Sequence, residues 1–187
     1  VEVLENNRIN LIYEITESDV VTVSKINFIG NVYFSSSELR KIMKTKPSTL
    51  LRILSSADNY DPDKVEYDKE LITEFYNNNG FPNFKFTSSI AQLVPNKNKF
   101  ELIFNVNEGE EYSFGNININ TELKKLDSDA MFNLIPVKQG DLYIKQNIKD
   151  SVKSIKDTAS IYGFTFIDIK FKENYDDKNK SVNVSFS

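Results

Sequence analysis

The chain contains no cysteine, no histidine and no tryptophan among its 187 residues. Without cysteine it has neither disulfides nor thiolate chemistry, although this absence does not identify the redox compartment. Without histidine it lacks the commonest metal ligand and the commonest acid or base near neutral pH. No apolar run approaches the roughly 18 residues of a transmembrane helix. These absences leave few routes to catalysis.

The charge balance is mildly acidic, with 27 acidic and 23 basic residues and a net charge of −4. This balance argues against nucleic acid or an anionic membrane surface as the main partner. The sequence has no phosphate-binding glycine loop and no nucleophile elbow. Glu66 and Glu70 lie four residues apart and could form a hydrolytic pair, but Lys69 lies between them and favours a solvated helix face. A hydrolase would need a concave pocket where two acids converge.

The most informative pattern is an interrupted internal repeat. A β-rich phrase recurs 91 residues later, and a helical block that ends in glycine recurs 83 residues later; the paired segments are 8–15 with 99–106, 23–28 with 114–119, and 60–80 with 143–163. Repetition at a fixed period is typical of a tandem array of one small module. We therefore expect residues 1–19 to be the last strand of a truncated preceding module, residues 20–109 a complete module, and residues 110–187 a second module. The first strand, Ile9–Ile15, has no predicted partner before it.

In the first complete module the pattern predicts the order β-α-α-β-β. A strand at 23–29 precedes a helix with Ser35 as N-cap and Glu38 three residues later as a capping box. A second helix begins with Asp61 and Pro62 and ends at Gly80. Strands at 84–94 and 100–106 complete the module.

The second module repeats this order with different residues. A strand at 114–119 precedes a helix capped by Asp127, and a second helix ends at Gly163. The spacing of that helix's apolar residues predicts one buried face, made of Ile148, Val152, Ile155, Ala159 and Tyr162. Strands at 164–171 and 181–186, joined by a turn at 176–179, form the closing hairpin.

Four phrases resemble a known family: Lys25–Asn31, Tyr76–Phe81, Leu93–Lys97 and Val106–Tyr112. In this order they are similar to the POTRA repeats of BamA-type outer-membrane protein assembly factors. The register matches the end of the second repeat, all of the third and nearly all of the fourth. The resemblance implies an α+β fold of tandem βααββ modules, each a three-stranded mixed sheet covered by two helices.

The resemblance also implies a function. Such segments lie in the periplasm at the outer membrane, where they guide unfolded outer-membrane β-barrel clients and dock accessory lipoproteins by β-strand addition. The family's third repeat is linked to a BamB-like propeller lipoprotein through its second strand, which maps onto Phe84–Val94. No enzymatic activity, cofactor or nucleic acid is implied, and the membrane is reached only through a C-terminal barrel outside this chain. A two-partner secretion transporter remains the alternative, and a division scaffold, which has a single such module, is less favoured.

The candidate partner-binding edge strand carries Phe84, Phe86, Ser88, Ile90 and Leu93. Three of its apolar residues share even parity, but Leu93 does not, so we expect a bulge between Ile90 and Leu93. Bulges are common at sheet edges, and an edge offers unpaired backbone groups to an added strand. The alternative is that these side chains fill the core and the edge binds nothing.

Two further segments are of interest. The acidic link Glu108, Gly109, Glu110 and Glu111 is expected to be a solvated hinge between the modules, as is the earlier link Glu17–Asp19. The segment Pro47–Asn59 is long and contains the apolar run Leu50–Leu54. That run is either packed against the module or a partner contact.

Overall fold

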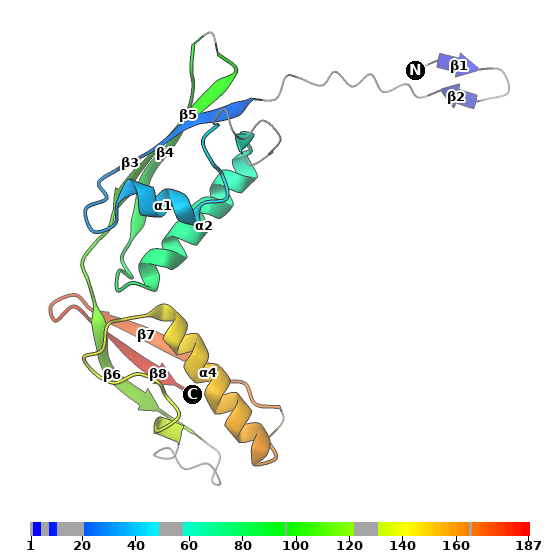
Figure 1. Cartoon of the computed structure of the whole chain (residues 1–187). Coiled ribbons are helices and arrows are strands. Elements are labelled where there is room, and N and C mark those ends of the chain that lie inside the picture. The colour runs from blue at the N-terminus through cyan, green and yellow to red at the C-terminus, as the bar shows by residue number, and fades with distance from the viewer. Residues whose placement is uncertain are drawn as a thin grey trace.

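The computed structural model of the protein describes residues 2–4, 8–10, 21–48, 58–95, 97–121, 131–164 and 166–187. Two similar α+β modules follow one another along the chain, and the second lies at the end of the first (Figure 1). Ahead of them, β1 (Glu2–Leu4) and β2 (Arg8–Asn10) pair antiparallel. The expectation that the first strand lacks a preceding partner is therefore wrong.

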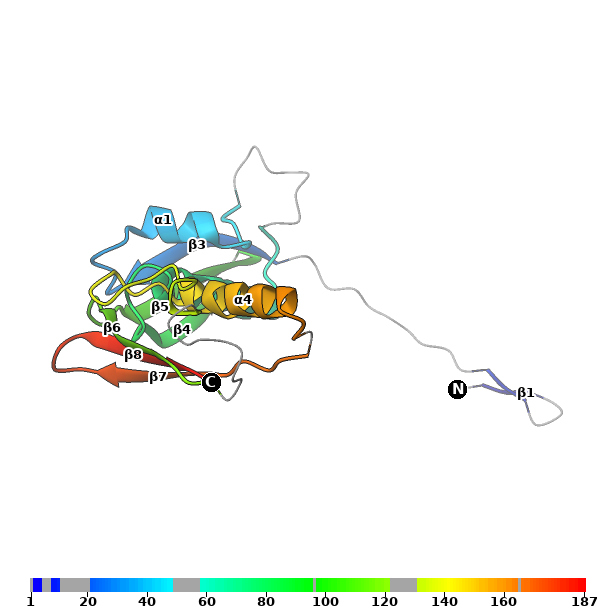
Figure 2. The same ribbon diagram turned by 90° about the horizontal axis from the view of Figure 1, so that it is seen from below.

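The first module consists of three strands and two helices: β3 (Thr22–Ile29), α1 (Ser36–Ile42), α2 (Pro62–Asn77), β4 (Lys85–Leu93) and β5 (Lys99–Asn107). The sheet order is β3-β5-β4, with β3 parallel and β4 antiparallel to the central β5. Both helices lie on one face of this sheet (Figures 1 and 2). Both β3 and β4 are thus edge strands.

The second module has the same plan, with β6 (Ser113–Ile119), α4 (Lys145–Ile161), β7 (Phe171–Asp176) and β8 (Ser181–Phe186). Its sheet order is β6-β8-β7, again with one parallel and one antiparallel pair. The predicted fold class, tandem α+β modules with three-stranded mixed sheets, is confirmed. The predicted cap of its first helix, Asp127, lies outside the described residues. Of the predicted first helix, Met131 and Phe132 are described, and both are helical.

Capping chemistry sets where the helices of the first module begin, as predicted, whereas α2 ends at Asn77, before the predicted end at Gly80. The backbone N–H of Glu38 donates to the Ser35 hydroxyl, and the N–H of Ser35 donates to the Glu38 carboxylate at 2.8 Å, which completes the capping box. At α2, the Asp61 carboxylate accepts from two backbone N–H groups, and Pro62 occupies the first turn. Each cap of this kind stabilises a helix by about 0.5–2 kcal/mol.

Each core lies between a sheet and its helices. Alternate residues of β5, namely Leu102, Phe104 and Val106, are buried, as the strand period requires. The Tyr76 ring from α2 stacks on Phe84 with 3.9 Å between ring centroids. Burial of each large apolar side chain contributes about 1.5–3 kcal/mol, so the sheet and the helices hold each other in place.

Two elements of the second module differ from prediction. The strand expected at 164–171 begins only at Phe171 and continues to Asp176. Among the described residues 164 and 166–170, only Lys170 exchanges backbone hydrogen bonds with the neighbouring strand, through Ser187. Tyr162, predicted on the buried face of α4, is the C-cap and is 66% exposed. Because α4 has its last residue at Ile161, Tyr162 lies outside the helical repeat that defines the buried face.

Some sequence features have no structural description. The apolar run Leu50–Leu54 and the link Glu17–Asp19 lie outside the described residues. Among the residues that are described, no helix has the length and apolar character needed to cross a bilayer. Those same ranges hold no cluster of three or more side chains that could bind a metal ion.

Candidate partner-binding edge and groove

The two edges of the first sheet differ in how the chain itself covers them. Along β3, the N–H of Ser48 donates to the carbonyl of Val23 at 2.7 Å, and the N–H of Tyr60 donates to the carbonyl of Val21 at 2.8 Å. An isolated bridge joins Thr22 to Asn59. The segment between α1 and α2 therefore covers the start of this edge.

The other edge, formed by β4, is open. β4 is the last strand of its sheet, and within the described ranges no segment pairs with its outer side. Every second residue of an edge strand directs its backbone N–H and C=O away from the sheet. β4 thus presents a row of hydrogen-bonding groups over its nine residues.

A bulge in β4 decides where its side chains point. The register shifts between Phe86 and Ser88, and pairing then continues without interruption through Ile90 to Leu93. The predicted bulge between Ile90 and Leu93 is therefore misplaced. Since residues directly opposite each other share a face, Ile90, opposite Ile103, points away from the helices. Leu93, opposite Phe100, returns to the helix-facing side.

The five predicted edge residues lie in different surroundings. Phe84 immediately precedes β4 and is buried in the core, and Phe86 is half-buried against α2. Ser88 accepts a hydrogen bond from the Asn105 side chain at 2.6 Å. Ile90 and Leu93 are 48% and 55% exposed. Phe84 and Phe86 thus pack in or against the core, Ser88 bonds to the neighbouring strand, and of the five only Ile90 and Leu93 are exposed aliphatic side chains.

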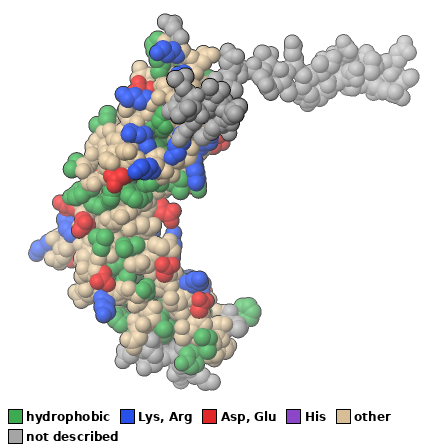
Figure 3. All heavy atoms as spheres, viewed as in Figure 1, with side chains coloured by type: hydrophobic (Ala, Val, Ile, Leu, Met, Phe, Trp, Pro, Cys, Tyr) green, Lys and Arg blue, Asp and Glu red, His purple; other side chains and the backbone are tan. Residues whose placement is uncertain are grey.

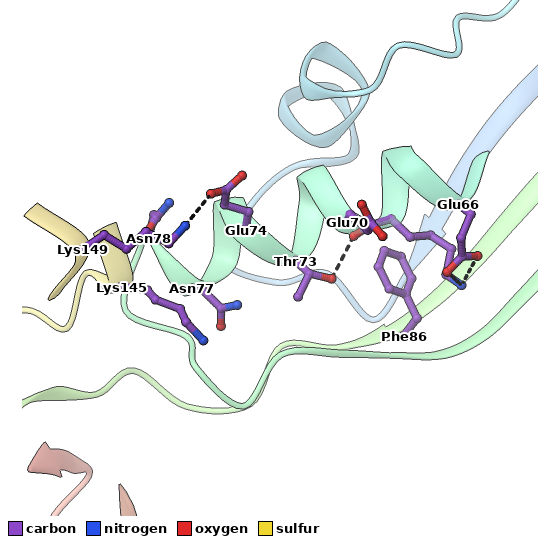
Figure 4. Close-up of a pocket in the computed structure, with 10 residues that line it drawn as sticks. Glu66, Glu70, Thr73, Glu74, Asn77, Asn78, Phe86, Lys145 and Lys149 are labelled. Carbon is purple, nitrogen blue, oxygen red and sulfur yellow. Dashed lines mark hydrogen bonds and ion pairs between the residues drawn. The ribbon is translucent and has the colours of Figure 1, made fainter. Parts of the chain in front are cut away.

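A groove of about 460 Å³ lies between α2 and the start of β4, where Phe86 is the β4 residue that lines it (Figure 4). One turn after another of α2, from Glu66 to Asn78, forms one wall, and the ring of Phe86 projects from β4 on the other side. Lys145 and Lys149 of α4 line its end. A strand added to β4 would therefore pass this groove near the start of β4.

The charges in the groove are of both signs. Lys69 donates to both oxygens of Glu66, at 2.8 and 3.0 Å, and its ammonium lies 5.7 Å from the centre of the Phe86 ring. Glu66 and Glu70 are both exposed on the helix. Their arrangement is that of a solvated helix face bordering an open groove.

The second module repeats the contrast between its two edges. Along β6, the N–H of Gly140 donates to the carbonyl of Phe114, and the N–H of Phe114 donates to the carbonyl of Asp141. The N–H of Tyr143 donates to the carbonyl of Tyr112 at 2.9 Å. In the described part of the chain, nothing pairs with the outer side of β7.

Within the link that connects the modules, Glu108 is not solvated, which corrects the prediction for this residue. It is 5% exposed, and its carboxylate accepts from the N–H of Val32 and from the hydroxyl of Tyr76, both at 2.7 Å. Burial, together with the hydrogen bond to Glu108, holds the pKa of Tyr76 well above its ordinary value of 10. Glu108 thus fastens the β3–α1 loop and α2 to the start of the link.

The other predicted hinge residues lie between the modules. Gly109 adopts a positive φ of 73° and donates its N–H to the Asn107 side chain at 3.0 Å. Glu110 is exposed and forms an ion pair with Lys180 of the second module. The exposed Glu111 packs its Cγ beside Gly80.

Several contacts across the boundary were not foreseen from the sequence. The N–H of Tyr112 donates to the carbonyl of Gly80, and the N–H of Gln146 donates to the Asn78 side chain, both at 2.8 Å. α4 has Ile144 at its N-cap position, which supplies no side-chain acceptor, so Asn78 of the first module caps this helix instead. The only hint in the sequence is the missing polar cap before Lys145.

Basic and acidic side chains alternate over the face shown in Figure 3, without a broad field of one sign. An extended basic surface is the usual footprint of nucleic-acid binding. This face therefore offers no such footprint.

Comparison with known proteins places the modules in one family. The family model described as "POTRA: Surface antigen variable number repeat" matches residues 21–109 and 112–187. The outer membrane protein assembly factor BamA of Neorickettsia risticii is 21% identical over 183 residues, which cover 98% of this chain and 24% of that protein. BamA of Neisseria meningitidis serogroup B is 23% identical over 96% of this chain and 22% of its own length. The chain thus spans about a quarter of the length of these curated relatives.

Among solved structures, POTRA3-5 of Haemophilus influenzae BamA is similar to this chain with a TM-score of 0.70 and 24% identity. The match covers 90% of this chain and 65% of that one. At this sequence identity, the structural similarity is evidence of a shared fold only. Both matched segments of the family model coincide with the two βααββ modules, whose sheets have the same strand order. The chain therefore belongs to the POTRA family.

Proposed function

We propose that this chain is a periplasmic segment of an outer-membrane β-barrel assembly factor, and that it binds client or accessory proteins by β-strand addition to the outer edge of β4. The relatives that match nearly the whole chain carry the name of such a factor. Localisation at the periplasmic face of the outer membrane follows from the same proposal.

The observation that carries the proposal is the contrast between the two edges of the first sheet. The start of β3 is covered by the chain itself, whereas the outer side of β4 is open and the start of β4 borders a groove. Backbone pairing depends little on the added sequence, which suits a protein that handles many clients. Each new hydrogen bond contributes about 0.5–1.5 kcal/mol net, so several together give weak, reversible binding.

The partners fall into two classes. Unfolded outer-membrane β-barrel clients supply extended segments, and an accessory lipoprotein of the BamB-like kind would dock at the first complete module. Ile90 and Leu93 supply aliphatic contacts on the two faces of β4. The side chains perform no chemistry in this function.

The segment Glu108–Glu111 has a mechanical role in the proposal. Glu108 is anchored in the first module, and Glu110 pairs with Lys180 in the second. The link between these two anchors would set the angle at which the modules present a bound strand.

Photo-crosslinking tests the function. Benzoylphenylalanine replaces Leu93 on β4 or, as the matched control, Lys25 on β3, and an unfolded outer-membrane β-barrel protein diluted from urea is added. We expect adducts from position 93 and few from position 25. Adducts from position 25 alone would overturn strand addition at β4.

A further inference from the structure

The groove beside β4 does not end with the first module. Two residues of α4, Lys145 and Lys149, line the same groove as Phe86 (Figure 4). In this view Lys145 extends beneath the end of α2, beside Asn77. A strand long enough to follow β4 toward the boundary would reach the second module.

Contacts across the boundary hold α4 in this position. The Asn78 side chain caps α4 at Gln146, and the carboxylate of Glu74 lies 3.4 Å from the ammonium of Lys149. A side chain added at Gly80 would meet Leu142 at 2.6 Å, so the two modules pack closely there. The contacts that join the two modules therefore also hold the end wall of the groove in place.

The charges along the groove are unequally distributed. The boundary end carries Lys145 and Lys149 against Glu74, whereas the far end carries Glu66 and Glu70 against a single lysine, Lys69. Lys145 is also the first residue of α4, where the helix dipole adds partial positive charge. The groove is thus more positive at the boundary than at its far end.

The present partners of the two boundary lysines are weak competitors for a ligand. Lys149 and Glu74 have side chains that are 53% and 54% exposed. Lys145 reaches Glu173, a residue outside the groove lining, only at 3.9 Å. Exposed ion pairs contribute little stability, so a ligand carboxylate can replace Glu74 at small cost. The Glu173 side chain is 14% exposed and keeps its hydrogen bond from the Tyr143 hydroxyl when Lys145 turns to a ligand.

We propose that Lys145 and Lys149 belong to the strand-binding site, and that they select strands whose boundary end is acidic. This inference rests on strand addition at β4 and adds a specificity to it. The binding site is then a composite of both modules. A partner strand then contacts the boundary between the two modules as well as the edge of β4.

Synthetic peptides with matched charges test the selection. Each is a capped ten-residue alternation of valine and threonine with a pair of glutamates or a pair of lysines, placed at the N-terminal or the C-terminal end. Fluorescence anisotropy measures the Kd of each peptide for the whole chain. We expect one glutamate peptide to bind more tightly than its lysine counterpart.

Charge reversal at the site and away from it completes the test. K145E with K149E should weaken binding of the preferred glutamate peptide about tenfold, since each exposed ionic contact contributes about three- to fivefold. K153E with K156E changes the net charge equally on α4, away from the groove lining, and should leave the Kd within about twofold of the wild-type value.

Three outcomes would overturn the inference. If the peptides protect the amides of β4 from hydrogen exchange but show no charge preference, strand addition stands and the lysine selection falls. Equal weakening by both double variants has the same meaning, because the effect is then one of net charge. If no peptide of either charge binds, strand addition at β4 and the selection fall together.

Discussion

Glu108 shows how one buried carboxylate can organise a module. Its oxygens accept from the backbone of Val32 and Tyr33 in the β3–α1 loop and from the hydroxyl of Tyr76 in α2. A buried charge is tolerated only when hydrogen bonds replace its lost hydration. Because these donors come from separate parts of the chain, Glu108 ties the beginning and the middle of the module to its end.

Replacing Tyr76 with phenylalanine tests this role. The variant keeps the ring that stacks on Phe84 but removes the hydroxyl that donates to Glu108. We expect Tyr76→Phe to lower the free energy of unfolding by about 1–3 kcal/mol, the usual cost of a missing partner for a buried charged group. Urea denaturation measures the change. Tyr67→Phe, at an exposed position of the same helix, is the control and should change little.

Acid should weaken the capping box of α1. Hydrogen bonds from the Ser35 hydroxyl and the Ser35 N–H hold the pKa of Glu38 below its ordinary value of 4.5. A depressed pKa contributes stability above the unfolded value, and this contribution is lost as pH falls from 4.5 through the folded pKa. Glu38→Gln should therefore show a shallower loss of stability between pH 5 and pH 3, in urea titrations at each pH. Parallel curves for both proteins would contradict this assignment.

At the scale of elements, Gly80 and Gly163 offer a matched comparison. Gly163 directly follows the C-cap of α4, and Gly80 lies two residues after the C-cap of α2. Both have a φ near +90°, a backbone conformation that disfavours any Cβ. A Cβ at Gly80 would also press on Leu142 and Glu111 of the joint, whereas a Cβ at Gly163 meets nothing within 4 Å.

Alanine at each position separates backbone strain from contact across the boundary. Gly163→Ala should cost about 1–2 kcal/mol from its φ alone. Gly80→Ala should cost more, because side chains of the second module must also move. Thermal unfolding of both variants measures the difference. Equal costs would mean that the joint adjusts freely around Gly80.

The elements could be predicted where the deciding interactions are local. Ser35 with Glu38 and Asp61 with Pro62 lie within one helical turn, so their spacing in the sequence determines where α1 and α2 begin. The bulge of β4 was misplaced because Ile90 and Leu93 are both exposed, so hydrophobic parity does not report the face on which they lie.

Interactions between distant segments escaped prediction for a physical reason. An acidic run is typical of a solvated link, and nothing in its composition reveals that the N–H groups of Val32 and Tyr33 surround Glu108. The cap of α4 comes from Asn78, 68 residues before Gln146. Such partners become visible only when the modules are assembled.

For the whole molecule, the cap from Asn78 implies a joint with a defined angle. Removing it leaves the first turn of α4 without a side-chain acceptor, because Ile144 supplies none. Asn78→Ala should therefore broaden the distribution of distances between spin labels at Lys41 and Lys156, measured by pulsed electron resonance. Asn79→Ala, which removes only a hydrogen bond within the first module, should leave the distribution unchanged. A broad distribution in the wild type would contradict a fixed joint.

Hydrogen exchange at the backbone amides of β4 is the sharpest test of whether this edge accepts a strand. In the free protein, alternate amides between Lys85 and Leu93 should exchange quickly, because β4 is the last strand of its sheet. Addition of a valine-threonine strand peptide should slow those amides and leave β3 unchanged. If a bound peptide slowed amides elsewhere but left the β4 amides fast, the open edge of β4 would not be the site of binding.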